Sequence, residues 1–565
     1  MGSLRAQIDS TAMTVSLSSL ATALHRTPGT IHWLTSNYLL ILAVLMLMNG
    51  WLPCQYHDAF SSSRLGLHLS GGDTLSKTKD QSFLSTGATS SVVVDPPKRA
   101  SHPKLILAIC CLSVLILSMD VTIVNVALPA IQRDLHARLA GLQWILDAYT
   151  LVVASFLMLS GSISDRFGRR RVFQIGLGIF TLASLLCSRA ATIEQLIGFR
   201  ALQGFGASML NPVALSIIAN AFPHPKARAR AVGVWGAVAG LSLGIGPVIG
   251  GALTETTGWR SIFWINVPIG ITAALLAARF VPESKAARAR AFDPVGQALV
   301  LIGLATLTWG VIEGPHEGWR SGLIISLFLI AVTALLAFVL YEPRRRDPLL
   351  DLRFFHSASF STATLLGLSS FSCFAGFLFL SALYLQQVRG FSAFYTGLFT
   401  VPLAIMMIVC APWSGRLVGS YGTRPSLLAA GAGFTLSTLM LTRLAPHTSV
   451  GWLVAAYALF GVGLGMVNPA ISNSAVAGMP LSQAGVAAAI ASTSRQVGAA
   501  IGVAVSGSVV ALSHARGTDF STSTHAIWWV MAACGATVLV LGFASNTAWA
   551  RASTERIAHL LEERH

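Results

Sequence analysis

Three ionisable residues, Asp120, Asp147 and Arg200, lie inside long apolar stretches of the sequence. If those stretches cross a membrane, each charge costs at least about 2.5–3.5 kcal/mol near the bilayer centre, so such residues are usually paired and functional. Desolvation favours the neutral form of a carboxyl group, whereas a nearby arginine favours the carboxylate. An acid balanced between these effects could take up a proton on one side and release it on the other. Arg200, which stays protonated, would tune that acid.

The three residues fall at a similar depth. At about 1.5 Å per residue, Asp120 lies about 22 Å along its stretch, and Asp147 and Arg200 lie about 8 and 10 Å along stretches that enter from the opposite side. In an apolar core about 30 Å thick, all three lie in the same half. Two alternatives stay open: Asp120 and Arg200 could form a purely structural ion pair, and Asp147, nearer the surface, could contact a cationic substrate.

A fourth charge, Arg495, lies well inside another apolar stretch. It could line a cavity, pair with an acid or contact an anionic substrate. Aromatic residues in membrane helices often face lipid, so each one alone is weak evidence for a binding site. The remaining residues that we consider for substrate contact are Asn125, Trp144, Tyr149 and Gln203.

The elements that must position these residues are the apolar stretches themselves. Of 565 residues, 54% are hydrophobic and only 11% are charged, against about 25% charged in soluble domains. A soluble fold is therefore excluded, and the predicted fold is an all-α integral membrane protein. Because about 20 apolar residues span a bilayer as a helix, fourteen transmembrane helices are predicted. They lie at about 105–131, 142–162, 171–189, 193–222, 229–253, 260–281, 295–313, 321–341, 358–382, 395–413, 426–445, 451–478, 485–512 and 524–545.

Charge and cysteine content argue against other classes. The net charge of +16 lies mostly in short loops, which indicates membrane topology rather than nucleic-acid binding. The seven cysteines form neither a disulfide nor a zinc pattern. The histidines show no metal-binding spacing and the chain has no phosphate-binding loop, which disfavours a membrane enzyme and a primary pump. No metal and no cofactor is predicted.

Basic residues also predict the orientation. Most Lys and Arg of the short loops follow the even-numbered helices, so that side and the C-terminus are predicted to be cytoplasmic. The apolar run at 38–48 is short for a span, so we interpret the N-terminal extension as disordered or as a mis-assigned start, with a fifteenth span as the alternative. The predicted parts are the extension 1–103, a six-helix half 104–281, two extra helices with flanking cytoplasmic loops 282–356, a second six-helix half 357–548 and a cytoplasmic tail 549–565.

An internal repeat supports the two halves. Two separate segments recur at nearly the same offset, which indicates duplication, and parallel repeated halves are typical of transporters. The segment around Gly161–Arg170 recurs around Gly415–Arg424. In the other segment, residues Ala201, Leu202, Gly204, Gly206, Met209, Asn211 and Pro212 recur as Ala458, Leu459, Gly461, Gly463, Met466, Asn468 and Pro469.

The copies differ at charged positions. Tyr457 stands at the position of Arg200, and Phe460 at that of Gln203. The Asp165–Arg166 pair becomes Gly419–Ser420. We therefore expect the ion chemistry to lie in the first half.

Four motifs carry a resemblance to a known family. They occur in order on the predicted helices and cover roughly residues 104–550. The loop after helix 2 contains Gly161, Asp165, Arg166, Gly168 and Arg169, helix 4 contains Arg200, Gln203, Gly204 and Gly206, helix 5 contains Gly240, Gly244, Gly246, Pro247, Gly250 and Gly251, and helix 1 contains Asp120, Asn125 and Pro129. Together they resemble the fourteen-helix drug:proton antiporter (multidrug efflux) branch of the major facilitator superfamily.

The resemblance implies a role for each motif. The helix 4 motif would serve proton transfer, and the loop after helix 2 would act as a gate in which Asp–Arg contacts latch the two halves. Gly161 would permit close packing there, and Gly168 a tight turn. The helix 5 motif, typical of exporters, would form a seal or hinge, because its small residues allow close packing and Pro247 bends the helix.

The predicted function is proton-coupled secondary active export of lipophilic drugs or related small molecules, a class that can include cations, across the plasma membrane. The partners would be protons, the substrate and the bilayer, with no enzymatic activity; the resemblance also implies a part in antibiotic resistance. A dedicated exporter of a neutral or anionic metabolite is the alternative, and a proton-coupled importer is a further one. A channel is disfavoured because it needs no repeated halves.

Overall fold

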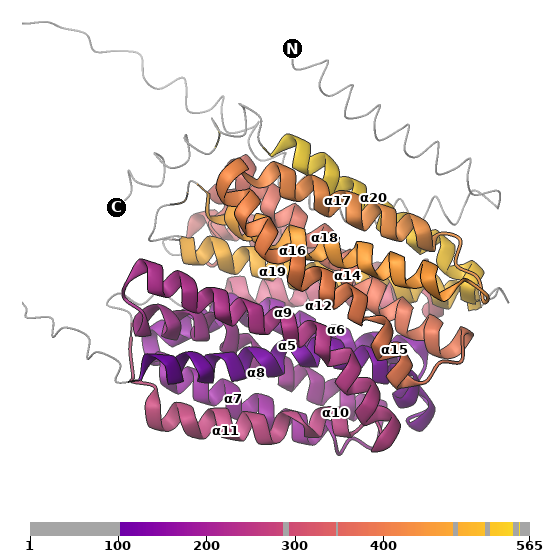
Figure 1. Ribbon diagram of the computed structural model, residues 1–565, viewed down its shortest axis with the longest axis horizontal. Helices are drawn as coiled ribbons and strands as arrows, with labels where there is room; N and C mark the ends of the chain where they lie inside the picture. The colour runs from indigo at the N-terminus through magenta and orange to yellow at the C-terminus, as the bar shows by residue number, and fades with distance from the viewer. Residues whose placement is uncertain are drawn as a thin grey trace, which may run out of the picture.

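The fold comes from a computed structural model that describes residues 102–285, 293–345, 348–477, 479, 484–514, 520–545 and 553. Most of the predicted N-terminal extension and C-terminal tail therefore lies outside the described residues. Within the described part the chain is helical throughout, without strands. Its helices form one elongated bundle (Figure 1).

The helices fall into three groups along the chain. The N-terminal set is α5 (Pro103–Asp134), α6 (Leu139–Phe167), α7 (Arg169–Cys187), α8 (Ile193–Ala221), α9 (Pro225–Thr256), α10 (Ser261–Trp264) and α11 (Asn266–Phe280). A connecting pair follows, α12 (Pro294–Glu317) and α13 (Gly322–Tyr341), with the short 3-10 turns η1 (Glu342–Arg344) and η2 (Leu352–His356). The C-terminal set is α14 (Ala358–Leu383), the π-helical turn η3 (Tyr384–Val388), α15 (Ala393–Phe399), α16 (Val401–Tyr421), α17 (Thr423–Leu441), α18 (Val450–Val476), α19 (Ala484–His514) and α20 (Phe520–Ala544).

Several helices begin at a side chain that caps them. Thr192 accepts a hydrogen bond from the backbone N–H of Gln195 at the start of α8, and Ser357 and Ser449 cap α14 and α18 in the same way. Such caps satisfy backbone donors that the first turn leaves free. The caps therefore mark where these helices start, and a continuous apolar stretch runs through each of them.

The same packing pattern occurs in both sets. In the N-terminal set α5 packs against α9, α8 packs against α6 and α7, and α11 packs on α7 and α5. In the C-terminal set α14 packs against α19, α18 packs against α16 and α17, and α20 packs on α17 and α14. Figure 1 shows the two sets as separate layers, indigo to magenta below and orange to yellow above. This recurrence is what a duplicated half would produce.

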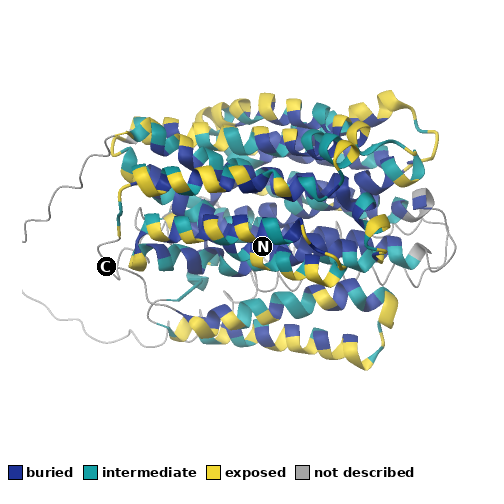
Figure 2. Ribbon diagram, turned by 90° about the horizontal axis from the view of Figure 1, so that it is seen from below, coloured by how far each residue is buried: buried dark blue, intermediate teal, exposed yellow. Residues whose placement is uncertain are grey.

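The N-terminal and C-terminal sets contact each other chiefly through α5, α6 and α9. Helix α6 lies along α19, α9 contacts α15 and α16, and α5 contacts α14. Helix α12 packs against both α6 and α19, so the connecting pair touches both sets. Residues at these contacts are largely buried, whereas the outer helix faces carry exposed apolar side chains (Figure 2). Exposed apolar flanks around a packed interior are expected where lipid is the solvent.

Thirteen helical segments of the described chain are long and apolar enough to cross a membrane. Each of the fourteen predicted stretches contains helix, but α17 is not among the thirteen. It starts three residues earlier than the predicted stretch at 426–445 and ends at Leu441, so it gains Arg424 and loses apolar residues. Two predicted helices are interrupted: the sixth after Trp264, and the tenth at Thr400, just before Pro402.

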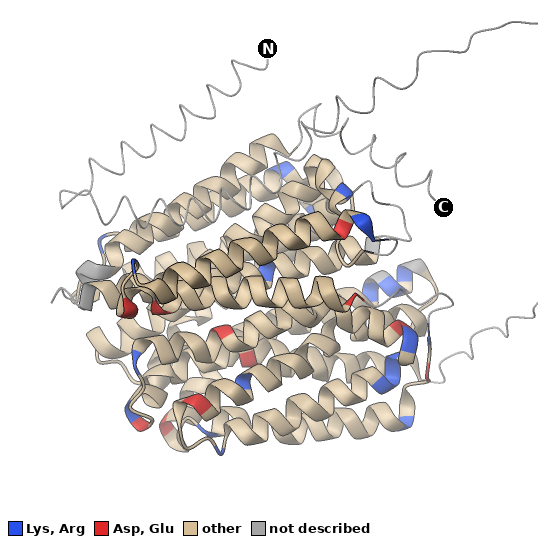
Figure 3. Cartoon of the chain, turned by 180° about the vertical axis from the view of Figure 1, so that it is seen from behind, with Lys and Arg blue, Asp and Glu red and all other residues tan. Residues whose placement is uncertain are grey.

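Basic residues gather at one end of the bundle (Figure 3). That end holds the turn between α6 and α7 and the start of α9, with Arg166, Arg169, Arg170, Arg171, Lys226, Arg228 and Arg230. We call it the arginine-rich end. The opposite end holds the last turns of α5 and α9 and the start of α15.

Candidate functional site

Asp120 and Arg200 form an ion pair inside the N-terminal set. Nη1 of Arg200 on α8 lies 2.5 Å from Oδ2 of Asp120 on α5. The side chains are 1% and 0% exposed, respectively. The ion pair that their similar depth allowed is therefore present, and both charges are sealed from solvent.

Additional donors surround this pair. Gln203 Nε2 donates to Asp120 Oδ1 at 3.0 Å, and Asn266 Nδ2 donates to the same oxygen at 3.2 Å. Arg200 also donates to Gln203 Oε1 at 2.7 Å and to the carbonyl of Ile145 at 3.1 Å. Asp120 thus accepts three hydrogen bonds, two of them from neutral amides. The Asp120 carboxylate and the Arg200 guanidinium compensate each other's charge in this geometry.

Tyr149 completes the cluster, and two further members were not predicted. The guanidinium carbon of Arg200 lies 4.3 Å from the centre of the Tyr149 ring, a favourable cation–π contact. Asn266 donates to Asp120 and to the hydroxyl of Ser184, and Ser184 donates to the carbonyl of Phe263. In the sequence, Asn266 and Ser184 are each a polar residue within an apolar stretch. The sequence alone did not indicate that these two side chains face Asp120 and Arg200.

The corresponding place in the C-terminal set is aromatic. Tyr457 and Phe460, at the repeat positions of Arg200 and Gln203, both contact Phe377 on α14, with ring centres 4.7 and 4.1 Å apart. Phe377 stands at the repeat position of Asp120. An apolar cluster therefore fills the site where the N-terminal set has the ion pair, so only the N-terminal copy has these groups for ion chemistry.

Asp147 is buried without partners. It lies on α6, is 0% exposed, and neither carboxylate oxygen has a hydrogen-bond donor in the described part of the chain. One turn earlier, Gln143 donates to the carbonyl of Ala504 on α19 at 2.8 Å, so this side of α6 faces the C-terminal set. Asp120 and Asp147 share a depth but not an environment: one carboxylate is fully compensated and the other is not.

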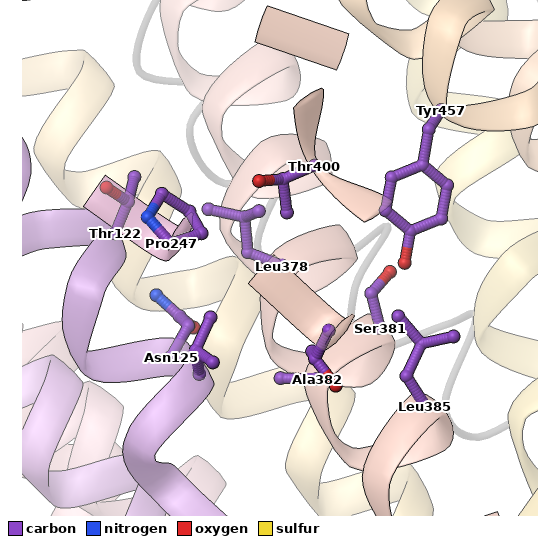
Figure 4. Close-up of a pocket in the computed structure, with 11 residues that line it drawn as sticks. Thr122, Asn125, Pro247, Leu378, Ser381, Ala382, Leu385, Thr400 and Tyr457 are labelled. Carbon is purple, nitrogen blue, oxygen red and sulfur yellow. The ribbon is translucent and has the colours of Figure 1, made fainter. Parts of the chain in front are cut away.

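A small cavity lies between the two sets (Figure 4). Its volume is about 10 Å³, room for about one water molecule. Tyr457 lines it from the C-terminal set with its hydroxyl next to Ser381. The lining residues are Thr122, Asn125, Val126, Pro247, Leu378, Ser381, Ala382, Leu385, Thr396, Thr400 and Tyr457. Asn125 is the predicted substrate residue at this cavity, and its side-chain oxygen has no hydrogen-bond donor among the described residues.

The helix 5 motif lies on α9 and packs closely on both sides. A Cβ atom at Gly246 or Gly250 would overlap α5 at Thr122 or Ile123, and one at Gly251 would overlap the backbone of Ala393. Gly244 faces Ala404 of α16, whereas Gly240 has only an ordinary contact with Met407, 3.7 Å away. Pro247 stays inside a continuous helix and lines the cavity. The motif therefore allows α9 to touch α5 and the C-terminal set at once.

The predicted gating motif surrounds the turn between α6 and α7. Arg169 lies 2.9 Å from Asp165, a contact within one turn. Gly168 has φ +114°, which favours glycine, and a Cβ there would overlap the carboxylate of Glu283, which accepts from the backbone N–H of Arg170 at 3.1 Å. The tight turn expected at Gly168 is present.

Two other members of the gating motif stand apart from these contacts. A Cβ atom added at Gly161 would meet nothing within 4 Å, so this glycine is not closely packed in this conformation. Arg166 lies over the ring of Phe167, with its guanidinium carbon 5.9 Å from the ring centre.

Trp144 and Arg495 lie away from the ion-pair cluster. Trp144 Nε1 donates to Glu313 of α12 at 3.3 Å, and the ring meets Trp309 edge-on, so this side chain helps to dock α12. Arg495 on α19 donates to Ser492 at 2.8 Å, and its guanidinium carbon lies 5.8 Å from the Phe371 ring centre. The residues predicted for proton coupling and substrate contact therefore fall into four places: the ion-pair cluster, the isolated Asp147, the cavity, and the outlying contacts of Trp144 and Arg495.

A bundle of apolar helices with a compensated ion pair inside, and a cavity between two similarly packed sets, is the architecture of a multi-pass membrane transporter. Comparisons with known proteins agree. The family model described as "Major Facilitator Superfamily" matches residues 110–503. The chain therefore belongs to the major facilitator superfamily.

Several curated relatives are named for drug resistance. The chain is 37% identical over 400 residues to "Multidrug resistance protein Stp" of Mycobacterium tuberculosis, covering 71% of this chain and 74% of that one. It is 36% identical to a "Methylenomycin A resistance protein" of Streptomyces coelicolor, covering 70% and 82%. It is 31% identical to "Multidrug efflux pump LfrA" of Mycolicibacterium smegmatis, covering 73% and 82%.

A solved structure shares the fold. The crystal structure of the peptide transporter POT in complex with sulfate superposes with a TM-score of 0.57 over 81% of this chain and 96% of that one, at 15% identity. At that identity the likeness concerns the fold alone. The family match confirms the superfamily that the four motifs indicated, and the solved structure agrees with the fold.

Proposed function

We propose that this protein is a proton-coupled exporter of lipophilic small molecules in the plasma membrane, with α17 as the fourteenth span and the C-terminus in the cytoplasm. The relatives named as multidrug efflux and antibiotic resistance proteins support export. The arginine-rich end is the cytoplasmic end in this proposal, because basic loop residues stay inside. The N-terminal and C-terminal sets act as the two six-helix halves, which alternate around the cavity.

The observation that carries proton coupling is the contrast between Asp120 and Asp147. Asp120 is fully compensated by contacts with Arg200 and two side-chain amides. Asp147 is equally buried, but nothing in the described chain donates to either oxygen. An uncompensated carboxylate is very costly in an apolar interior, so a neutral acid is the form that fits this environment. Asp147 is therefore our proton carrier, and the Asp120–Arg200 pair is a fixed charge pair beside it.

Contacts between the two sets at the end opposite the arginine-rich end support a conformation that is closed toward the outside. Gln387 Nε2 donates to Gln132 Oε1 at 2.8 Å, and Gln386 donates to the carbonyl of Val126 at 2.8 Å. Both bonds join the two sets. The cavity above them is too small for a drug-sized molecule, which needs a pocket of about 300 Å³ or more. Transport therefore requires the two sets to separate around it.

Inside-out vesicles with an imposed pH gradient test the function. Three fluorescent lipophilic probes cover the charge classes: ethidium as a cation, a BODIPY propionic acid as an anion and its methyl ester as a neutral compound. We expect gradient-driven accumulation of at least one probe that a protonophore abolishes. Accumulation that a protonophore leaves unchanged would contradict proton coupling, and no accumulation of any probe would contradict the export function.

A further inference from the structure

Arg495 is a charge inside a predicted span that no acid of the described residues neutralises. Its guanidinium has one hydrogen bond, to Ser492 on the same helix, and no carboxylate of the described chain lies within 4.0 Å of it. Arg200, by contrast, has Asp120 at 2.5 Å. An arginine in this setting needs a counter-ion, because desolvating an unpaired charge is costly.

The neighbouring helices supply no such counter-ion. Helices α14, α18, α19 and α20 contain no Asp or Glu. On α6, Asp147 lies one to two turns nearer the opposite end, and Asp165 is paired with Arg169. On α12 the acids are Glu313, which accepts from Trp144, and Glu317, which lies near His316. The counter-ion of Arg495 is therefore missing from the described chain in this conformation.

Arg495 lies on the face of α19 that meets α14. Gly498 and Gly502 pack on the α14 backbone at Leu368 and Ser372, and the position of a Gly367 Cβ would be 3.5 Å from Arg495 Cγ. The guanidinium then reaches the half-buried ring of Phe371. Arg495 thus stands beside α14 rather than toward lipid.

Phe371 connects this position to the cavity. It precedes Leu378 by seven residues, two helical turns, so both lie on one face of α14 and about 10 Å apart along it. Leu378 lines the cavity. Since α14 begins at the arginine-rich end, Phe371 and Arg495 lie between that end and the cavity. A molecule that enters from the arginine-rich end meets them first.

We propose that Arg495 binds the acidic group of an amphipathic anionic substrate, a carboxylate or an ionised hydroxyl, whose apolar body lies against Phe371 and extends toward Leu378. This rests on the proposed export function and names its substrate class. A guanidinium binds a carboxylate through two parallel hydrogen bonds, and such bonds are strong where water is excluded. Arg495 lies about 16 Å along α19, deeper than a lipid head group reaches. The acid therefore belongs to the transported molecule.

The test compares the BODIPY propionic acid with its methyl ester, which differ only in the charge. Transport is measured in inside-out vesicles for the wild type, Arg495→Gln and Arg495→Lys, with Arg416→Gln as a control at an exposed arginine of α16. We expect Arg495→Gln to raise the KM for the acid about tenfold or more, because a charge-assisted bond is lost. The KM for the ester should change less than about twofold, and Arg495→Lys should lie between the wild type and Arg495→Gln for the acid.

The outcomes separate the two proposals. Equal loss of acid and ester in Arg495→Gln would overturn the anion site and make Arg495 a structural residue. Unchanged transport of the acid, or wild-type transport of ethidium or the ester without the acid, would also overturn it while leaving export intact. If the wild type transports none of the probes, the export function itself fails and the anion site fails with it.

Discussion

At the scale of single residues, two buried acids of similar depth have opposite surroundings. Asp120 has Arg200, Gln203 and Asn266 as partners, whereas Asp147 has none among the described residues. The sequence predicted that Asp120, Asp147 and Arg200 share a depth, because spacing sets depth along a helix, and it left an Asp120–Arg200 pair as one possibility. It could not predict Asn266 as a partner or the isolation of Asp147, because these depend on how helices rotate about their axes.

This contrast predicts opposite effects on stability. Removing the charge of Asp120 in Asp120→Asn leaves Arg200 buried and uncompensated, and breaking such a pair costs about 3–5 kcal/mol. Asp147→Asn replaces an acid that has no partner to lose, so we expect little change. Thermal unfolding of the purified variants in one detergent measures both. Equal destabilisation by the two substitutions would contradict the assignment of the fixed pair.

At the scale of elements, α9 is a helix that packs closely against its neighbours through glycine. The helix 5 motif predicted that small residues on this helix would permit it, and Gly246, Gly250 and Gly251 do pack closely against α5 and α15. Helix breaks were not predicted, although a proline follows each one: Pro402 comes two residues after Thr400, and Pro268 lacks the N–H that would bond to the carbonyl of Trp264. Pro247 stays inside the continuous α9, so the presence of a proline alone did not tell which helices would be interrupted.

A matched pair of glycines on α9 tests the packing. In Gly250→Ala the new methyl group would meet the Ile123 side chain and the Ile123 carbonyl at 3.0 Å, so backbone must shift. Overpacking of this kind costs about 1–3 kcal/mol. Gly236→Ala, on the same helix, has nothing within 4 Å and should be neutral or slightly stabilising. The measurements are the unfolding temperature and the gradient-driven transport of each variant. Equal unfolding temperatures and equal transport in both variants would contradict the tight α5–α9 contact.

At the scale of the whole molecule, duplication organises the bundle. The offset of two short segments predicted repeated halves, and equivalent helices pack in equivalent pairs in the described chain. The sequence also predicted that charge would differ between copies, and the aromatic cluster of Phe377, Tyr457 and Phe460 now occupies the place of the ion pair. Which conformation the two sets adopt was not predictable, because both states use the same helices.

Alternation of the two sets predicts that a cross-link at the outer end blocks transport. Gln132 on α5 and Gln387 in η3 touch across the sets. A double variant Gln132→Cys with Gln387→Cys, treated with a short bis-methanethiosulfonate reagent, should lose nearly all transport and recover it after reduction. The single-cysteine variants control for modification alone. Full activity of the cross-linked protein would contradict separation of the sets at this end.

The central claim is that Asp147 carries the proton that the transporter exchanges for its substrate. The most direct measurement is proton release on substrate binding, recorded with a pH indicator in a weakly buffered solution of the purified protein, using whichever of the three probes the wild type transports. We predict that the wild type releases protons, that Asp147→Asn binds the probe but releases none, and that Asp120→Asn, where it remains folded, still releases them. Undiminished release from Asp147→Asn would contradict the account.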